Sequence, residues 1–249
     1  MKCIVEQLAT EYQDEGGGPC ILMLHGWQDQ LHTFDAITGI LTRTHRVVRL
    51  DLPGFGSTER PKEVWGVDEY VQFVADFITK LDLHVDVLIG HSFGGRIAIK
   101  GIATKHLQPR TLVLIASAGI AKRRTIRHTA LGVVAKVGRA ATSIPGISRW
   151  KKTLRRRLYG AIGSDYFRTG PLRETFLKVI SEDLSGSARE ITTPTLLIWG
   201  AHDTATPVTE GQQLSQLIPH ARLTVLPNVG HFVHQEYPSE VSTYIMDFI

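Results

Sequence analysis

Six short apolar runs recur along the chain, and longer amphipathic segments separate them. The runs cover residues 20–24, 46–51, 85–89, 111–115, 195–199 and 222–226. Residues 20–24 are continuously apolar, which is typical of a strand that is buried on both faces of a parallel sheet. Because such strands alternate with helical segments, the sequence predicts an α/β fold with a mainly parallel sheet flanked by helices.

The helical signal is found in four of the separating segments, 67–81, 93–105, 208–218 and 239–248. In the first, apolar side chains recur at the spacing of one helix face, and Asp68 near its start favours a helix N-terminus. Residues 3–12, followed by the glycines 16–18, are a candidate hairpin at the edge of the sheet.

Residues 119–190 do not follow this alternation of apolar runs and amphipathic segments. Glycines and prolines separate helical pieces there, and no clear strand is present. We therefore expect 1–118 and 191–249 to form one core domain, with 119–190 as a helical cap inserted into it. The charge is divided in a similar way. Residues 120–180 carry 15 lysines and arginines against two acidic residues, a net charge of +13, and the rest of the chain carries −9.

Composition indicates the general class to which this protein belongs. The 249 residues are 43% hydrophobic and 21% charged, which suits an ordinary globular domain of this kind. The first six residues carry charge, no run is long enough to span a membrane, and Cys3 and Cys20 are too few for a disulfide framework. These features predict a cytoplasmic protein that is not transmembrane.

The sharpest chemical signal is Gly-His-Ser-Phe-Gly-Gly at 90–95, between a predicted strand and a predicted helix. A serine on such a tight turn projects its hydroxyl clear of the sheet, and small residues two positions away on either side let the turn form. The helix that starts there directs its positive end at a developing oxyanion. This context predicts Ser92 as a catalytic nucleophile.

A serine hydroxyl needs a base, and the base needs an acid to orient it. His231 follows the sixth strand and Asp203 follows the fifth, so both are expected at the carboxyl edge of the sheet, where ligands bind. His234 is the nearest alternative base. Asp51 and Asp86 are alternative acids, each also explicable as a strand-end or turn residue.

The oxyanion requires two backbone donors. One is expected from the N–H of Phe93, directly after the nucleophile, and the other from Trp27 in the loop His25-Gly26-Trp27. Trp27 and Phe93 are therefore the predicted substrate-binding residues. In the alternative interpretation, the Trp27 side chain only fills space in the core. His25 is expected to hold its loop by hydrogen bonds rather than transfer protons.

At this point the chain resembles the α/β-hydrolase superfamily over nearly its whole length. The motifs are His25-Gly26-Trp27, Asp51-Leu52-Pro53-Gly54-Phe55-Gly56-Ser57, the serine turn at 90–95, and the pair Gly200-Ala201-His202-Asp203 with Gly230-His231. The resemblance implies a mainly parallel eight-stranded sheet with a helical cap, and it implies neither cofactor nor metal.

The resemblance leaves the reaction open, because this fold hosts many chemistries. Serine at position 92 argues against the epoxide hydrolases and dehalogenases of the fold, which use an aspartate nucleophile. C–C bond hydrolases often carry Asn where this chain has His91. The expected activity is hydrolysis of a carboxylic ester with a small or medium acyl group. A C–C hydrolase, a hydrolase of carrier-protein-bound acyl esters and a non-catalytic binding protein are the alternatives.

The basic predicted cap allows three interpretations. It is a solvated face without a partner, a docking site for an acidic protein or anionic ester, or a surface for anionic lipid, for which residues 150–159 form a basic, partly amphipathic stretch. No nucleic-acid partner is expected, because no recognition motif accompanies the charge.

Overall fold

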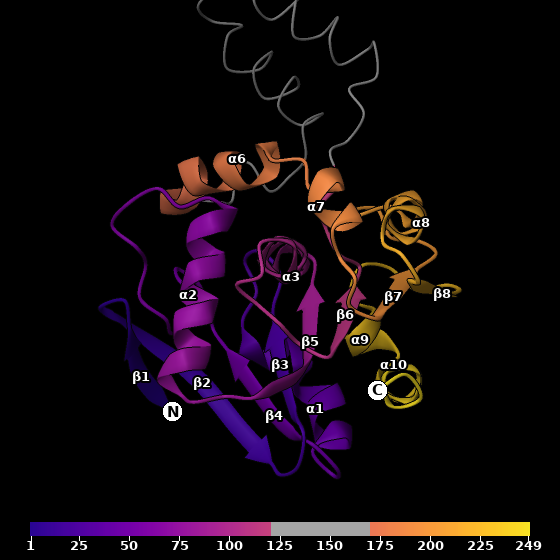
Figure 1. The fold of residues 1–249 in the computed structure, drawn as a ribbon, viewed down its shortest axis with the longest axis horizontal. Helices are drawn as coiled ribbons and strands as arrows, with labels where there is room; N and C mark the ends of the chain where they lie inside the picture. Colours follow the sequence, from indigo (N-terminus) through magenta and orange to yellow (C-terminus); the bar gives the residue numbers. More distant parts are fainter. Residues whose placement is uncertain (121–169) are drawn as a thin grey trace, which may run out of the picture. The chain divides into compact units, whose positions relative to one another are not determined.

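A mainly parallel sheet organises the chain (Figure 1). The computed structural model describes residues 1–120 and 170–249. Within them the sheet has eight strands in the order β1-β2-β4-β3-β5-β6-β7-β8. β2 runs antiparallel to both of its neighbours, β1 and β4, and the other neighbouring pairs of these eight strands are parallel. The predicted fold class is confirmed. The strands are β1 (Lys2–Val5), β2 (Leu8–Gly16), β3 (Cys20–Leu24), β4 (Arg46–Leu50), β5 (Val85–His91), β6 (Thr111–Ile115), β7 (Thr195–Gly200) and β8 (Arg222–Leu226).

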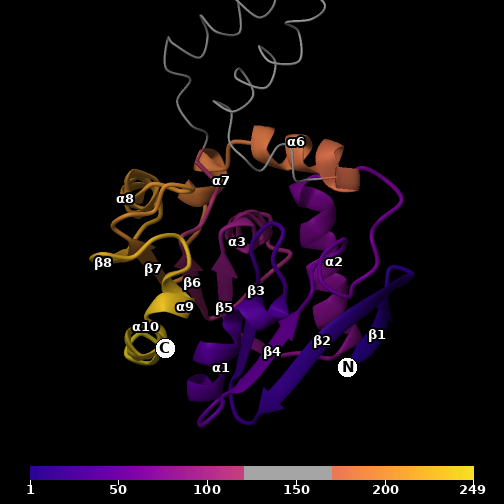
Figure 2. The same cartoon turned by 180° about the vertical axis from the view of Figure 1, so that it is seen from behind.

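Helices cover both faces of this sheet (Figures 1 and 2). One face carries α2, α3 and α8, and the other carries α1, α9 and α10. No helix in the described ranges is long and apolar enough to cross a membrane. The helices are η1 (Leu31–Phe34), α1 (Asp35–Leu41), α2 (Val67–Lys80), α3 (Phe93–Ala103), η4 (Gly170–Leu172), α6 (Arg173–Ser181), α7 (Ser185–Arg189), α8 (Val208–Leu217), α9 (Val233–Glu236) and α10 (Pro238–Met246).

The core explains why the apolar runs are continuous. Every residue of β3 is buried, because helices cover both of its faces. Ile21 and Met23 join the core cluster that also contains residues of α1 and α10, such as Ile37 and Ile245. Burial of one such side chain stabilises the fold by roughly 1.5–3 kcal/mol.

The N-terminal hairpin turns at Glu6 and Gln7, and Val5 pairs with Leu8 across the turn. Both turn residues have positive φ, 45° and 66°, in a two-residue connection that usually favours Asn or Gly. The candidate hairpin at 3–12 is therefore present, but its turn gives no composition signal. Of the glycines at 16–18, Gly16 instead ends β2 and the other two follow it.

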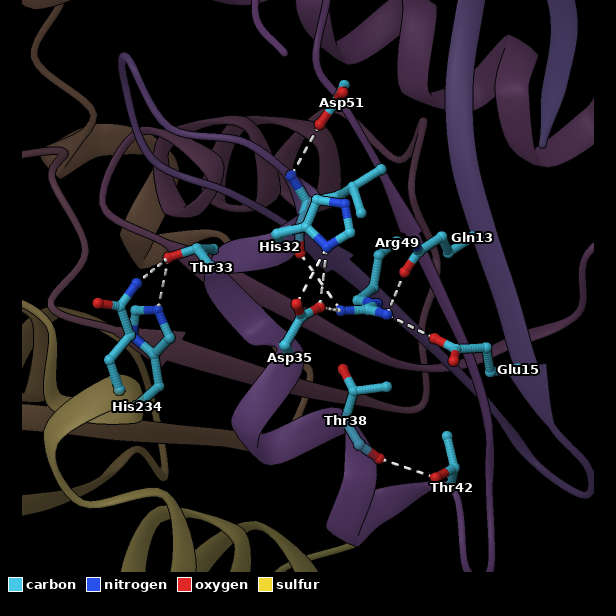
Figure 3. Close-up of polar contacts among 12 residues, drawn as sticks. Gln13, Glu15, His32, Thr33, Asp35, Thr38, Thr42, Arg49, Asp51 and His234 are labelled. Atoms are coloured by element: carbon cyan, nitrogen blue, oxygen red, sulfur yellow. Dashed lines mark hydrogen bonds and ion pairs between the residues drawn. The ribbon is translucent and has the colours of Figure 1, made fainter. Parts of the chain in front are cut away.

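A buried arginine on β4 joins several elements (Figure 3). The Arg49 side chain is 3% exposed and pairs with Glu15 on β2 at 2.5 Å and with Asp35 at the start of α1. It also bonds Gln13. Burial raises the pKa of Asp35, but the bonds from Arg49 and His32 outweigh it and hold that pKa below its ordinary value. A buried charge is tolerated because its partners compensate the lost hydration.

The chain leaves the core after β6 and returns at a place fixed by backbone bonds. The Leu184 N–H donates to the Gly119 carbonyl at 2.9 Å. On α3, Arg96 is buried and donates to the carbonyls of Val179, at 2.7 Å, and Glu182. The chain segments at Gly119 and at Leu184 are thus held side by side.

The predicted domain division remains a prediction. Met1–Ala121 and Leu177–Ile249 form one compact unit, and Lys122–Phe176 form a second. Most of the predicted cap at 119–190 lies outside the described residues, as does the basic stretch at 150–159.

Candidate active site

Ser92 lies on a strained turn between β5 and α3. Its φ of 49° and ψ of −107° are outside the regions that L-residues normally occupy, and such strain is commonly found at functional sites. The turn is held by its backbone, because the Ser92 N–H donates to Ile115 at 3.1 Å and the Ser92 carbonyl accepts from Ala118 at 3.0 Å. This geometry is the strand–turn–helix elbow that the sequence predicts.

The glycines around Ser92 are required by close packing. A Cβ on Gly94 would lie 2.0 Å from the Leu24 carbonyl oxygen, and a Cβ on Gly90 would lie 2.7 Å from backbone atoms of Gly94 and Gly95. Backbone atoms cannot move aside as a flexible side chain can. The elbow therefore forms only with glycine at these positions.

We expect Gly94→Ala to destabilise the protein strongly, by at least the 1–3 kcal/mol typical of overpacking. The matched control is Gly39→Ala on α1, where a Cβ meets nothing within 4 Å. That change should stabilise the helix by about 0.5–1 kcal/mol. Denaturant unfolding of both variants tests this. Equal stabilities would contradict the packing argument.

Asp203 lies in the loop after β7 and is fixed by its own neighbours. Its Oδ1 accepts the N–H groups of Ala205 and Thr206 at 2.8 and 2.9 Å, and its Oδ2 contacts the Thr206 hydroxyl at 2.9 Å. The carboxylate is fully buried. Thr206 also contacts His231 Nδ1, at 3.3 Å, and is a site residue that the sequence analysis missed.

His231 reaches Asp203 because the loops after β7 and β8 are bonded together. The N–H of Ala201 donates to Leu226, and that of His202 donates to Val229, both at 2.9 Å. A Cβ on Gly200 would lie 2.2 Å from the Gly230 carbonyl oxygen, so glycine permits the approach. His231 Nδ1 then lies 2.8 Å from Asp203 Oδ2.

The Asp203 carboxylate is held in its charged form. Burial raises its pKa, but hydrogen bonds from His231 and Thr206 outweigh burial, and the pKa lies below its ordinary value. An ionised carboxylate at Nδ1 keeps the proton on that nitrogen and leaves Nε2 free to accept one. Among the described residues, the Ser92 hydroxyl makes no hydrogen bond to the His231 ring. Such bonds are often long before substrate binds.

Aromatic rings form a packed cluster next to Ser92. The Trp27 ring lies edge-on to Phe93 and to Phe55, with centroids 5.2 and 4.9 Å apart. Tyr70 from α2 packs against Phe93 at 4.9 Å. The structure therefore brings the predicted residues Trp27 and Phe93 together. It adds Phe55, which belongs to the motif at 51–57, and Tyr70, which the sequence did not single out. The Gly94 N–H donates to the His25 carbonyl at 3.0 Å and ties the Trp27 loop to α3.

The alternative acids and His25 have other partners. Asp51 accepts the N–H groups of Leu31 and Ser57, both at 2.7 Å (Figure 3 shows the first). Asp86 accepts the Cys20 N–H at 2.9 Å. His25 accepts the Leu52 N–H at Nε2, so its Nδ1 carries the proton and donates to the Gly26 carbonyl at 2.7 Å. No described group of three or more histidine, cysteine or acidic side chains could hold a metal.

Three buried histidines predict that the protein is sensitive to acid. Burial lowers the pKa of His25 and of His91, and it lowers the pKa of His234 to about 3. The unfolded chain binds protons at these sites near pH 6.5, whereas the folded chain does not. Stability from these rings is therefore complete above about pH 6.5 and is lost as the pH falls. For His234, whose folded pKa is about 3, the loss approaches about 1.4 kcal/mol per pH unit below about pH 6.5, and His25 and His91 add to it in the same direction.

Denaturant unfolding between pH 7 and pH 5 measures this slope. His234→Leu should reduce it by about one proton, or about 1.4 kcal/mol per pH unit. An unfolding free energy that does not change over this range would contradict the neutral assignment of the three rings.

Comparison with known proteins places the chain in a family. A model of the alpha/beta hydrolase family matches residues 21–243, which include the elbow and both loops of the site. The chain belongs to the alpha/beta hydrolase family. The resemblance predicted from the sequence motifs is confirmed.

Relatives of this hydrolase differ in substrate. It is 26% identical to an uncharacterized hydrolase, YugF, of Bacillus subtilis, over 96% of this chain and 93% of that protein. It is 26% identical to a pimeloyl-(acyl-carrier protein) methyl ester esterase of Nitrosomonas europaea, over 90% and 93%. Haloalkane dehalogenase 2 of Mycobacterium tuberculosis is 27% identical, over 95% and 90%. Family membership supports a hydrolase and leaves the substrate open.

Solved structures share the fold of this hydrolase. A membrane phospholipase A described as a bacterial virulence factor matches with a TM-score of 0.77 and 24% identity, covering all of this chain and 84% of that one. The enol-lactonase of Burkholderia xenovorans LB400 matches with a TM-score of 0.74 and 21% identity, covering 100% and 99%.

Proposed function

We propose that this hydrolase cleaves a carboxylic ester of a small or medium acyl substrate through an acyl-enzyme on Ser92. The observation that carries the proposal is the buried, charged Asp203 at 2.8 Å from Nδ1 of His231. That contact makes His231 a base whose accepting nitrogen is Nε2. The strained elbow of Ser92 supplies the nucleophile at the same edge of the sheet.

The reaction proceeds in two halves. Ser92 Oγ attacks the ester carbonyl carbon and gives its proton to Nε2 of His231, and the N–H groups of Phe93 and Trp27 stabilise the oxyanion. The carbon–oxygen bond breaks, and the leaving alcohol takes the proton from His231. Water then attacks the acyl-enzyme, His231 accepts its proton and returns it to Ser92, and the carboxylic acid leaves. Asp203 stabilises the imidazolium in both halves.

Residue 92 favours an ester hydrolase over the other activities found among the relatives. The dehalogenases and epoxide hydrolases of this fold use an aspartate nucleophile, and this chain has serine. A relative that cleaves a methyl ester, the Nitrosomonas esterase, agrees with the proposal. The aromatic cluster of Trp27, Phe93 and Phe55 next to Ser92 suits an apolar acyl group.

The test is hydrolysis of p-nitrophenyl esters of graded acyl length, with fluorophosphonate labelling of Ser92 in parallel. We expect turnover with an optimum in acyl length, and labelling that mass spectrometry locates at Ser92. Labelling without turnover of any ester would point to a C–C hydrolase. Absence of both would overturn the proposal and favour a binding protein of this fold.

A carrier-protein-bound ester is the second candidate, because residues 120–180 carry a net charge of +13 and a relative acts on such a substrate. Cleavage of an acyl methyl ester on an acidic carrier protein, compared with the free methyl ester, tests it. We expect a preference for the carrier-bound ester that falls steeply as salt is raised. Equal rates at all salt concentrations would exclude the carrier as the recognised group.

A further inference from the structure

His91, the residue directly before Ser92, is buried in a group of aromatic rings. Its side chain is almost completely excluded from solvent. Its ring centroid lies 4.8 Å from that of His231, 4.6 Å from His234 and 5.4 Å from Phe232. The nucleophile elbow and the loop of the base therefore meet at this ring, although they are far apart in the sequence.

One hydrogen bond joins His91 to the base. Its Nε2 lies 3.2 Å from the backbone carbonyl oxygen of His231. A carbonyl oxygen can only accept, so Nε2 must carry the proton and Nδ1 is a bare lone pair. Within the described ranges Nδ1 has no hydrogen-bond partner. It faces Gly26, where a Cβ would lie 3.0 Å away. His91 is thus a neutral donor directed at a single acceptor.

The other side of the base loop is fixed independently. Directly after His231 and Phe232 comes the short helix α9, whose His234 and Gln235 both bond the Thr33 hydroxyl, at 3.0 and 2.7 Å. Figure 3 shows this contact between α9 and η1. The base loop is therefore held by His91 at the His231 carbonyl and by Thr33 three and four residues further on, at His234 and Gln235. Only the first contact comes from the nucleophile elbow.

We propose that His91 is a positioning residue, which sets the position of His231 relative to Ser92 through its bond to the His231 carbonyl. The inference rests on the proposed function of Ser92 and His231. The Ser92 nucleophile and the His91 donor are adjacent in the chain, so a shift of the elbow carries the base with it. A proton transfer depends on the separation of its two atoms, and an error of about 1 Å can cost about 100-fold in rate.

Two substitutions distinguish a role of His91 as a hydrogen-bond donor from a role in which its ring only fills space in the core. His91→Gln keeps an N–H near the place of Nε2, whereas His91→Leu keeps apolar volume and removes the donor. We expect His91→Leu to lower kcat by about 10- to 100-fold with little change in KM, and to slow fluorophosphonate labelling in proportion. His91→Gln should restore most of the rate. The matched control is Val74→Ala on α2, a core truncation on the face opposite α9, which should lower Tm without lowering kcat.

Three outcomes would overturn the proposal. The first is a wild-type kcat in His91→Leu. The second is equal loss in the Leu and Gln variants. The third is a loss no greater than that of Val74→Ala at matched Tm, which would mean that His91 acts only through stability.

A measurement without turnover keeps this test separate from that of the proposed function. In the folded protein, ¹⁵N NMR should show a slowly exchanging Nε2–H on His91, with shifts of the His231 ring in His91→Leu but not in His91→Gln. If wild type neither turns over esters nor labels, the proposed function fails, and the NMR result still decides whether His91 holds His231. Unchanged His231 resonances in His91→Leu would overturn the positioning role.

Discussion

Ser92→Ala is expected to lower ester turnover by about 10⁶-fold and to leave the fold intact. The substitution removes only the hydroxyl, and the bonds that hold the elbow are made by the backbone N–H and carbonyl of residue 92. Alanine adds no atom to the crowded turn. Measurement of kcat, Tm and fluorophosphonate labelling on the same preparation tests the prediction.

Ser117→Ala is the matched control for this experiment. Ser117 is a buried serine beside the elbow, and its hydroxyl donates to the Ala118 carbonyl at 2.8 Å. Loss of that bond should cost about 1 kcal/mol of stability and leave turnover within an order of magnitude of wild type. Retained activity in Ser92→Ala, or equal losses in the two variants, would show that Ser92 is not the nucleophile.

Asp203→Asn should lower kcat by about 10⁴-fold, because it reverses the tautomer of the base. The Asn oxygen can still accept the N–H groups of Ala205 and Thr206, which orients the amide nitrogen towards His231. An N–H at that place donates to Nδ1. The proton of the ring then moves to Nε2, and the base can no longer accept one from Ser92.

The alternative acid supplies the control for Asp203. Asp51→Asn weakens the two backbone bonds that the carboxylate accepts from Leu31 and Ser57, and should lower Tm with a much smaller effect on kcat. If Asp51→Asn were the slower enzyme, the acid would be Asp51 and the assignment of Asp203 would be wrong. Both variants need only steady-state kinetics and thermal unfolding.

Much of the fold could be predicted because its signals are local. The apolar runs at 20–24 and 195–199 are buried along their whole length, so their composition alone indicates strands that are covered on both faces of a parallel sheet. The elbow could be predicted for the same reason, since Gly90, Ser92 and Gly94 stand directly between a strand signal and a helix signal in the sequence.

Most of what could not be predicted depends on partners that are distant in sequence. The turn at Glu6 and Gln7 is a local exception, because it has positive φ without glycine and its residue types therefore give no signal. In the sequence, Arg49 is a charged residue within a predicted strand. Only the structure shows that Glu15 and Asp35 lie beside it and form ion pairs with it. His91 carries no sign in the sequence that its donor meets the carbonyl of His231.

The bond between Leu184 and Gly119 bears on how such a chain can evolve. It closes the long segment between them at its ends, and Arg96 on α3 secures the returning chain. Because the core fixes both ends, lengthening the segment adds only a slowly growing loop entropy, and new sequence there need not disturb the strands. The segment can therefore change its length and its residues at a different rate from the core, so that lineages can vary it while they keep one inherited sheet.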